Sequence, residues 1–365
     1  MALAVVAVAL AICGAAAAQD MARDTAQTWD ELVAAAQKEG TVVVIGPAHP
    51  GIRRALPEAF KSRFGVNVEY IGGPGGIAAS KIRAERAAGI YSTDVALAAV
   101  QTLQTVFYAE KMLEPLRPLL ILPEVTDRSK WKRGELWFPD PEQEYVLRLF
   151  NSAAELFSIN TREVKPADMP SARDLFLNPK FRGRIASHDP TVTGTGSAFA
   201  AVMYVQLGED FVRKLYVDQK TAISRDERQL TDWLLRGTYP IVFGADDAQI
   251  ESMRKEGMPV EAVYSIPGFA PLVLGGNGLI AVFNHAPHPN AAKLFVNWIA
   301  SRDGLELYAR TVKWATTRND IDEASFLPPE VIPKPGVEYF DGYDWDFALN
   351  TKLKVRMWLK EQLAR

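Results

Sequence analysis

The sequence predicts an α/β protein with two lobes, each built on a doubly wound sheet, and with hinge strands that join the lobes. Three observations predict this fold. Short apolar runs alternate with amphipathic segments along most of the chain, which is the order that builds a sheet with helices on both faces. The 365 residues, 48% of them hydrophobic, suffice for two domain cores. The sequence contains no internal repeat and no low-complexity linker, which favours paired crossover strands between the lobes.

An apolar stretch without a charged residue extends from Ala2 to Ala18 and ends in Ala16, Ala17 and Ala18 before Gln19. This pattern predicts a signal peptide at residues 1–18, because the stretch is shorter than the roughly 20 apolar residues that span a membrane. The one cysteine of the chain, Cys13, lies in this segment. Disulfides and cysteine metal sites are therefore not expected in the exported chain.

The first lobe begins with a pattern that is typical of a parallel sheet. The run from Thr41 to Ile45 is rich in β-branched residues and is bounded by glycines, so we expect a buried strand there. Two further strands follow at short spacing, with helices between them. The expected elements are helices at 28–39, 53–64 and 77–88 and strands at 41–45, 66–71 and 94–98.

The order of helices and strands begins again near residue 167, which predicts a second lobe. An apolar stretch at 145–159, broken at Asn151, is expected to hold two strands. The chain then returns to the first lobe, so we assign 28–125 and about 264–320 to the first lobe, and about 126–263 and 321–365 to the second. The later elements are expected to be helices at 171–177, 198–207, 226–236, 246–255, 291–301 and 303–310, with strands at 185–187, at 241–244 and within 268–283.

A run of small and hydroxyl residues, Asp189 to Ser197, leads into the expected helix at 198–207. Such residues leave backbone N–H groups accessible at a helix start and add hydroxyl donors, which suits an anion or a carboxylate. Thr195, Gly196 and Ser197 are therefore candidate binding residues. The alternative is an ordinary capped helix start, although the run is longer than a cap requires.

A glycine-rich turn at 72–76 follows the second expected strand. Glycines allow positive φ angles and a close approach of the backbone to a ligand, which makes Gly75, Gly76 and Ile77 candidates for ligand contact. A plain turn is the alternative. The glycine spacing does not match the dinucleotide fingerprint, and the sequence contains no P-loop.

Three ionisable residues also follow expected strands. His49 lies just beyond the first strand, where a neutral imidazole can bind a solute, with a solvated loop histidine as the alternative. Asp246 and Asp247 begin the helix after the strand at 241–244, so their carboxylates can simply complement the helix dipole. In a closed cleft they would instead hold an amine, a hydroxyl-rich solute or a metal ion, and the sequence leaves the presence of a metal open.

The overall charge indicates a small partner. The formal net charge is −3, the pI is near 5.9, and no run of Lys or Arg occurs, so nucleic acid is not an expected partner. The aromatic residues between 131 and 145 are expected in a core, with the wall of a cleft as the alternative. The aromatic cluster at 339–345, together with Trp358, is expected to be a closing segment packed across the surface.

Several segments resemble one known family. Residues 29–40, 178–190, 194–197 and 288–295 are similar to the extracellular solute-binding proteins of family 1, and to the ferric-iron type of ABC transporter substrate-binding protein in particular. The resemblance extends from about Thr28 to beyond Tyr308. It implies a type II periplasmic-binding fold, a periplasmic location, ABC permease subunits as partners, no cofactor and no catalysis. By position it implies ligand contacts at His49, Gly75, Gly76, Ile77, Thr195, Gly196, Ser197, Asp246 and Asp247.

The resemblance does not specify the solute. Iron-binding members carry adjacent tyrosines after the strand that corresponds to 241–244, whereas residues 245–250 include none, so tyrosinate-bound ferric iron is not expected. Relatives take phosphonates, sugar phosphates, thiamine, polyamines or an iron complex. The helix starts favour an anionic group, and Asp246 and Asp247 favour a cationic one. An aminophosphonate zwitterion would satisfy both.

Two other functions are alternatives. A periplasmic hydrolase would use Ser197 as its nucleophile, but the residues around Ser197 do not form the Gly-x-Ser-x-Gly elbow of such enzymes. A ligand-sensing receptor subunit would use the same two lobes to contact a membrane receptor. For a solute carrier we expect a monomer.

Overall fold

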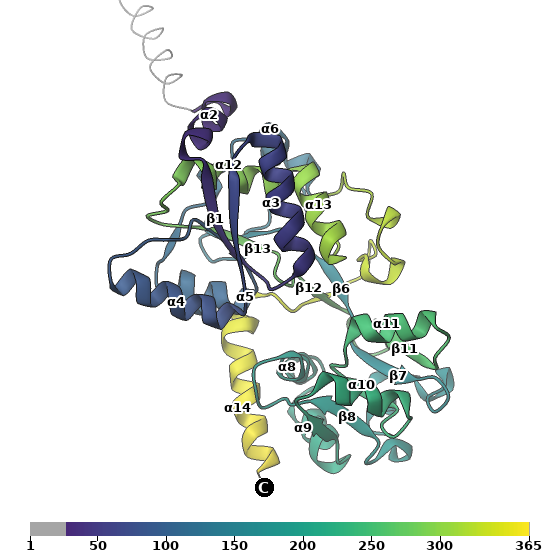
Figure 1. Cartoon of the computed structure of the whole chain (residues 1–365). Helices are drawn as coiled ribbons and strands as arrows, with labels where there is room; N and C mark the ends of the chain where they lie inside the picture. The colour runs from purple at the N-terminus through teal and green to yellow at the C-terminus, as the bar shows by residue number, and fades with distance from the viewer. Residues whose placement is uncertain (1–26, 365) are drawn as a thin grey trace, which may run out of the picture.

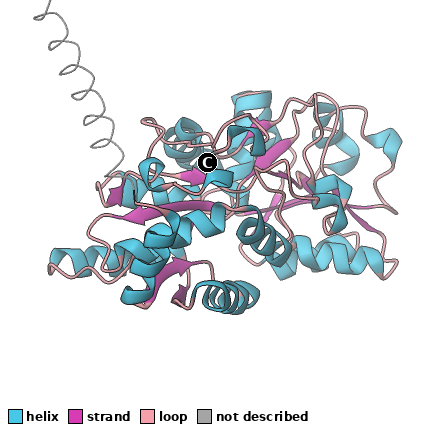
Figure 2. Cartoon of the chain, turned by 90° about the horizontal axis from the view of Figure 1, so that it is seen from above, coloured by secondary structure: helices cyan, strands magenta, loops and turns pink. Residues whose placement is uncertain are grey.

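The computed structural model describes residues 27–364, without the side chains of residues 247 and 248. The predicted signal peptide at 1–18 and Cys13 lie outside the described residues. The chain forms two lobes joined by a small sheet (Figure 1), and helices lie on both sides of the strands in the view from above (Figure 2). The two-lobed α/β fold predicted from the sequence is confirmed. No helix in the described part of the chain is long and apolar enough to cross a membrane.

The first lobe is built on a mixed sheet with the strand order β2-β1-β3-β13-β4, and β5 pairs with β13. β1 is parallel to β2, with Gly46 opposite Gly72 at their last residues, and β13 runs antiparallel to β3. The turns after β1 and β2 therefore lie at the same edge of the sheet. The strands are β1 (Thr41–Gly46), β2 (Asn67–Gly72), β3 (Val95–Ala98), β4 (Leu113–Glu114), β5 (Leu147–Arg148) and β13 (Leu279–Phe283).

Alternating strand residues fill two cores in this lobe. Val42 and Val44 belong to the core with α2, α3, α12 and α13, whereas Ile45 belongs to the core with α4 and the following helical turns. The strands are thus buried on both faces, as an apolar run predicts. The helices are α2 (Trp29–Glu39), α3 (Pro50–Phe64), α4 (Gly75–Ala87), α5 (Val100–Thr102), η1 (Leu103–Tyr108), η2 (Arg117–Leu119), α6 (Pro123–Thr126), η3 (Arg128–Lys130), α12 (Pro289–Ala300), α13 (Arg302–Val312), η7 (Glu323–Ser325) and η8 (Pro329–Val331).

The second lobe has a five-stranded sheet with the order β11-β7-β10-β8-β9. β8 and β10 are parallel and end near each other, at His188 and Phe243. Phe243 packs on the side of α7, α8 and α9, and Val242 packs on the side of α10 and α11. The elements are β7 (Phe157–Asn160), η4 (Pro166–Asp168), α7 (Ala172–Phe176), η5 (Pro179–Phe181), β8 (Ile185–His188), α8 (Thr195–Leu207), α9 (Glu209–Arg213), η6 (Lys214–Asp218), β9 (Ala222–Ser224), α10 (Glu227–Leu235), β10 (Ile241–Phe243), α11 (Asp247–Lys255) and β11 (Val260–Val263).

A three-stranded hinge sheet joins the lobes, in the order β14-β12-β6. β6 (Ser152–Ala154) leads into the second lobe, β12 (Leu272–Leu274) returns antiparallel to it, and β14 (Phe340–Asp341) lies parallel to β12. Arg148 is fully buried at the end of β5 and donates to both carboxylate oxygens of Asp341, at 2.8 and 2.7 Å. This pair fastens β14 to the first lobe.

The lobe boundaries differ from those that the sequence suggested. Trp131 and Phe138 are buried in the same core as Val42, so the segment from about 126 to 150 packs in the first lobe. Ile321 joins that core too, whereas Ile266 belongs to the core of the second lobe. The aromatic residues of this segment bury against helices that are distant in sequence, and a local pattern does not record such contacts.

The C-terminal segment crosses from the first lobe to the second. Tyr343 packs in the first lobe, and Trp345 meets Tyr108 edge to face with ring centroids 5.0 Å apart. Beyond the turn η9 (Phe347–Thr351), α14 (Lys352–Leu363) buries Val355 and Leu359 in the core of the second lobe. Figure 1 shows α14 in yellow, running along the lower lobe near α8.

Candidate functional site

The carboxyl ends of β1, β2 and β3 form one half of the candidate site. A pocket of about 80 Å³ lies there, and Gly75, Thr102 and Asn277 line it. Of the predicted residues in this lobe, Gly75 is in the pocket, whereas Gly76 and Ile77 are exposed beside it. This half is small, and its lining combines apolar residues such as Ile45 and Leu97 with glycine backbone and the side chains of Thr102 and Asn277.

The helix α4 begins at this pocket without a capping side chain. Its N-cap residue is Pro74, and the first turn contains no acidic residue. A Cβ atom on Gly75 would lie 2.4 Å from Oγ1 of Thr102, so only glycine allows the hydroxyl to approach the helix start this closely. The positive end of the helix dipole and a hydroxyl donor therefore lie side by side.

The second half of the site lies where β8 and β10 end. A pocket of about 140 Å³ is bounded by Thr195 at the start of α8, by Gly244 after β10, and by the hinge residue Leu274. The C-terminal segment closes it with Phe347 and Lys352. Most of its walls are apolar, and its polar groups come from Thr195, Lys352 and Glu155.

The predicted residues Thr195, Gly196 and Ser197 form the first turn of α8. The N-cap residue is Gly194, no side chain caps the helix, and the first turn contains no acidic residue. A Cβ atom on Gly196 would lie 2.1 Å from the backbone oxygen of His188, so glycine allows α8 to start directly on the end of β8. Thr195 lines the pocket and is exposed, whereas Gly196 and Ser197 are buried behind it.

Ser197 is bonded within its own helix. Its hydroxyl donates to the backbone oxygen of Gly194 at 3.0 Å. A nucleophilic serine needs a base within hydrogen-bonding distance to accept its proton, and a backbone carbonyl does not act as one. This geometry gives no support to the hydrolase alternative.

His188, which the sequence analysis did not select, lies beneath the loop before α8. Its Nδ1 atom is buried and has no hydrogen-bond partner in the described structure. The ring lies so close to Gly194 that a Cβ atom there would be 3.1 Å from Cε1 of His188. Buried polar atoms are rarely left without a partner, so Nδ1 of His188 can form one more hydrogen bond.

The predicted ionisable residues have structural roles in this conformation. His49 is the N-cap of α3, and its Nδ1 accepts from the backbone N–H of Ile52 at 3.3 Å. Asp246 is the N-cap of α11 and accepts from the backbone N–H of Gln249 at 3.0 Å. Neither lines the two pockets described above. Asp247 is the first residue of α11, and its side chain lies outside the described structure.

Lys352 is a candidate site residue that sequence reasoning missed, because it lines the pocket of the second lobe. It is the first residue of α14 and is half-buried, and its Nζ donates to the backbone oxygen of Gly342 at 3.1 Å. Burial lowers the pKa of Lys352 to about 8, against the opposite influence of Asp341. The residues next to Lys352 in the sequence do not indicate that it reaches a pocket. The path of the chain through β14 and the following turn brings Lys352 there.

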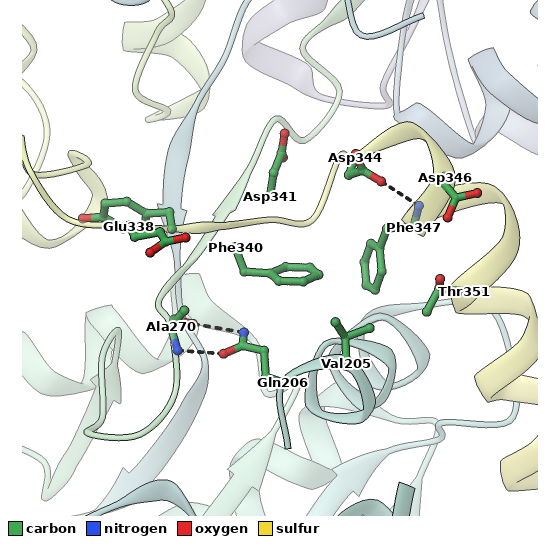
Figure 3. A pocket seen from close by; sticks show the side chains of 11 residues that line it. Val205, Gln206, Ala270, Glu338, Phe340, Asp341, Asp344, Asp346, Phe347 and Thr351 are labelled. Carbon is green, nitrogen blue, oxygen red and sulfur yellow. Dashed lines mark hydrogen bonds between the residues drawn. The ribbon is translucent and has the colours of Figure 1, made fainter. Parts of the chain in front are cut away.

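Two larger pockets lie away from the strand ends. One of about 480 Å³ has an acidic rim that includes Asp344 and Asp346 (Figure 3). These carboxylates accept from Phe347 N and Asn350 Nδ2, at 2.8 and 2.6 Å, and therefore organise the C-terminal turn. The other, of about 650 Å³, lies beside β6 and between α11 and the segment after α13. No cluster of three or more potential metal-binding side chains occurs among the described residues.

Comparison with solved structures supports the fold. Iron-bound HitA from Pseudomonas aeruginosa matches with a TM-score of 0.59 and 17% identity over 86% of this chain and 99% of that chain. AfuA from Actinobacillus pleuropneumoniae, a periplasmic binding protein with fructose-6-phosphate bound, matches at 0.59 and 20%, over 90% and 100% of the two chains. IdiA (FutA) from Trichodesmium, with iron and citrate, matches at 0.66 and 13%, over 88% and 99%.

The family is shown by the sequence itself. No curated protein matches this chain, but the family model for bacterial extracellular solute-binding proteins matches residues 55–334. This match covers most of both lobes and includes the starts of α4 and α8. The match spans well over half of the 365 residues, so the chain belongs to the bacterial extracellular solute-binding protein family.

Proposed function

We propose that this protein is the periplasmic binding component of an ABC importer, and that it binds a small solute with an anionic group between its lobes without catalysing a reaction. The observation that carries the choice of an anion is the pair of uncapped helix starts, one in each lobe. Both helices begin at the carboxyl edge of their sheet and at a pocket. A bound anion would accept hydrogen bonds from the unpaired N–H groups and complement both helix dipoles.

Other long helices that begin after non-helical backbone support this interpretation, because side chains already occupy their starts; α14 has no such start, since it continues directly from η9. Thr28 caps α2, His49 caps α3, and Ser301 caps α13. At the start of α12, the Glu39 carboxylate accepts from the backbone N–H groups of Asn290 and Ala291, at 3.1 and 2.7 Å. The starts of α4 and α8 have no such capping side chain, as an anion-binding site requires.

A thermal-shift screen tests the proposal. Residues 19–365 would be mixed with phosphonates, sugar phosphates, polyamines, thiamine and ferric salts. A bound solute at 100 times its Kd should stabilise the protein by about 2.7 kcal/mol, and we expect this effect from members that carry a phosphonate, phosphate or carboxylate group. Stabilisation by polyamines or neutral sugars alone would contradict an anionic solute.

A substitution at the start of α8 tests the position. Thr195→Asp would put a carboxylate where the anion is proposed, so we expect the free protein to gain about 0.3–1 kcal/mol and the solute to bind more weakly. Thr126→Asp, at an exposed position in α6, is the matched control. If both variants bind the solute like the unaltered protein, the start of α8 is not the site.

A further inference from the structure

The C-terminal helix α14 directs two cationic side chains toward the start of α8. Lys352 lines the pocket that Thr195 also lines. One helical turn later, the Arg356 guanidinium donates to the hydroxyl of Thr193 in the loop before α8. Trp358 packs against Tyr204 of α8 with ring centroids 5.5 Å apart, so α14 is held in this position by packing that does not involve the two cations.

The two cations are not fully matched by carboxylates around this loop. Residues four apart on a helix are neighbours, and two like charges at that spacing repel each other. Asp341 is the acidic group that acts on Lys352, but it also forms the ion pair with Arg148. Asp189 pairs with Arg225 at 2.8 Å. Glu155 also lines this pocket and offsets part of the positive charge. The positive end of α8 adds to the two cations, so the net field at the start of α8 still favours an anion.

The pocket has room for a small ligand group. Its volume of about 140 Å³ is well above the roughly 10–15 Å³ that a single water molecule requires. Phe199, Leu274 and Phe347 provide apolar walls, while the ammonium group of Lys352 and the hydroxyl of Thr195 provide donors. Glu155, whose carboxylate accepts from the hydroxyl of Ser158, also lines the pocket.

We infer that Lys352 and Arg356 complete an anion-binding subsite at the start of α8, and that the solute is a small organic anion whose short apolar body lies against Phe199, Leu274 and Phe347. This inference rests on the proposed function and narrows its solute class. Apolar walls contact an alkyl group well, whereas the hydroxyls of a sugar phosphate would find few polar partners in this pocket beyond Glu155 and Thr195. An alkylphosphonate or a short-chain carboxylate fits both the donors and the walls.

The lowered pKa of Lys352 agrees with this subsite. A buried ammonium group with one backbone acceptor lacks the water that it would have at the surface, which disfavours its charged form. An anion beside it would stabilise the charged form and raise the pKa.

Calorimetric titration with propylphosphonate, butyrate and glycerol 3-phosphate tests the inference. We expect propylphosphonate or butyrate to bind more tightly than glycerol 3-phosphate, and Lys352→Met and Arg356→Met each to raise the Kd roughly tenfold or more. Lys360→Met, an exposed position on the same helix, is the control and should change the Kd less than twofold.

Equal Kd values for the Lys352, Arg356 and Lys360 variants would overturn the subsite and leave the proposed function intact. If glycerol 3-phosphate binds more tightly than propylphosphonate and butyrate, the inference that the solute has an apolar body is wrong.

A chemical labelling experiment gives an answer even when calorimetry detects no heat. The acetylation of each lysine in the unaltered protein would be followed by mass spectrometry, with and without millimolar propylphosphonate at constant ionic strength. Slower labelling of Lys352, with unchanged labelling of Lys360, is the expected result. Equal labelling of Lys352 in both conditions would overturn the inference, whereas a general failure of every anion in the thermal-shift screen would contradict the proposed function itself.

Discussion

Lys352 places an ammonium group in the pocket of the second lobe, and burial lowers its pKa from 10.5 to about 8. Between these two values the unfolded chain binds more protons than the folded chain. The contribution of this group to stability therefore rises as the pH increases from about 8 to 10.5, and below pH 8 the buried charge costs up to roughly 3 kcal/mol.

Replacement of Lys352 should therefore stabilise the ligand-free protein. We expect Lys352→Met to raise the free energy of unfolding at pH 7 and to reduce its increase between pH 7 and pH 10, because the titrating group is gone. Urea unfolding at both pH values measures this. Lys360→Met serves as the control for an exposed lysine. The same pH dependence in all three proteins would show that Lys352 is not desolvated.

Gly196 is a second residue at which a single distance predicts the effect of a substitution. A Cβ atom there would lie 2.1 Å from the backbone oxygen of His188, and backbone cannot move aside as a flexible side chain can. We expect Gly196→Ala to destabilise the protein by about 1–3 kcal/mol, measured by urea unfolding. Gly76→Ala, with no atom within 4 Å of the added Cβ, should be neutral or slightly stabilising. A similar effect of both changes would mean that α8 can shift from β8 without cost.

Among the elements, the hinge strand β14 pairs with β12 and also carries an ion pair whose arginine is fully buried. The Arg148 side chain has no solvent exposure, and its guanidinium also donates to the backbone oxygen of Phe150 and to Asn151 Oδ1, at 2.9 Å each. We expect Asp341→Ala to leave this charge without its carboxylate and to cost about 3–5 kcal/mol in urea unfolding. Asp303→Ala, which breaks an exposed pair with Arg63, should cost about 0–1 kcal/mol. Equal losses would show that packing and the pairing with β12 hold β14 without the ion pair.

The sequence predicted most elements of both lobes, because strands such as 41–45 and helices such as 53–64 have local patterns of apolar residues. It did not predict β14, which is two residues long and pairs with a strand about 70 positions earlier. The segment around Trp131 was also assigned to the wrong lobe. In each case, contacts between residues distant in sequence decide the structure.

At the scale of the whole molecule, the two half-sites line separate pockets, and the hinge sheet joins the lobes that carry them. One pocket, with Gly75 and Thr102, belongs to the first lobe, and the other, with Thr195 and Lys352, belongs to the second lobe and the C-terminal segment. The helix starts were visible in the sequence through their glycines and threonines. Lys352 and Arg356 were not, because the path of the chain through β14 brings α14 beside α8.

A solute that contacts both half-sites must bring the lobes together. Ligand binding shifts such a protein toward the state that makes more contacts, so we expect saturating propylphosphonate to lower the radius of gyration measured by X-ray scattering. Lys352→Met at the same concentration should retain the larger radius, because the subsite in the second lobe would be weakened, and Lys360→Met should respond like the unaltered protein. An unchanged radius in the unaltered protein, despite calorimetric binding, would mean that the solute occupies one half-site without closure of the lobes.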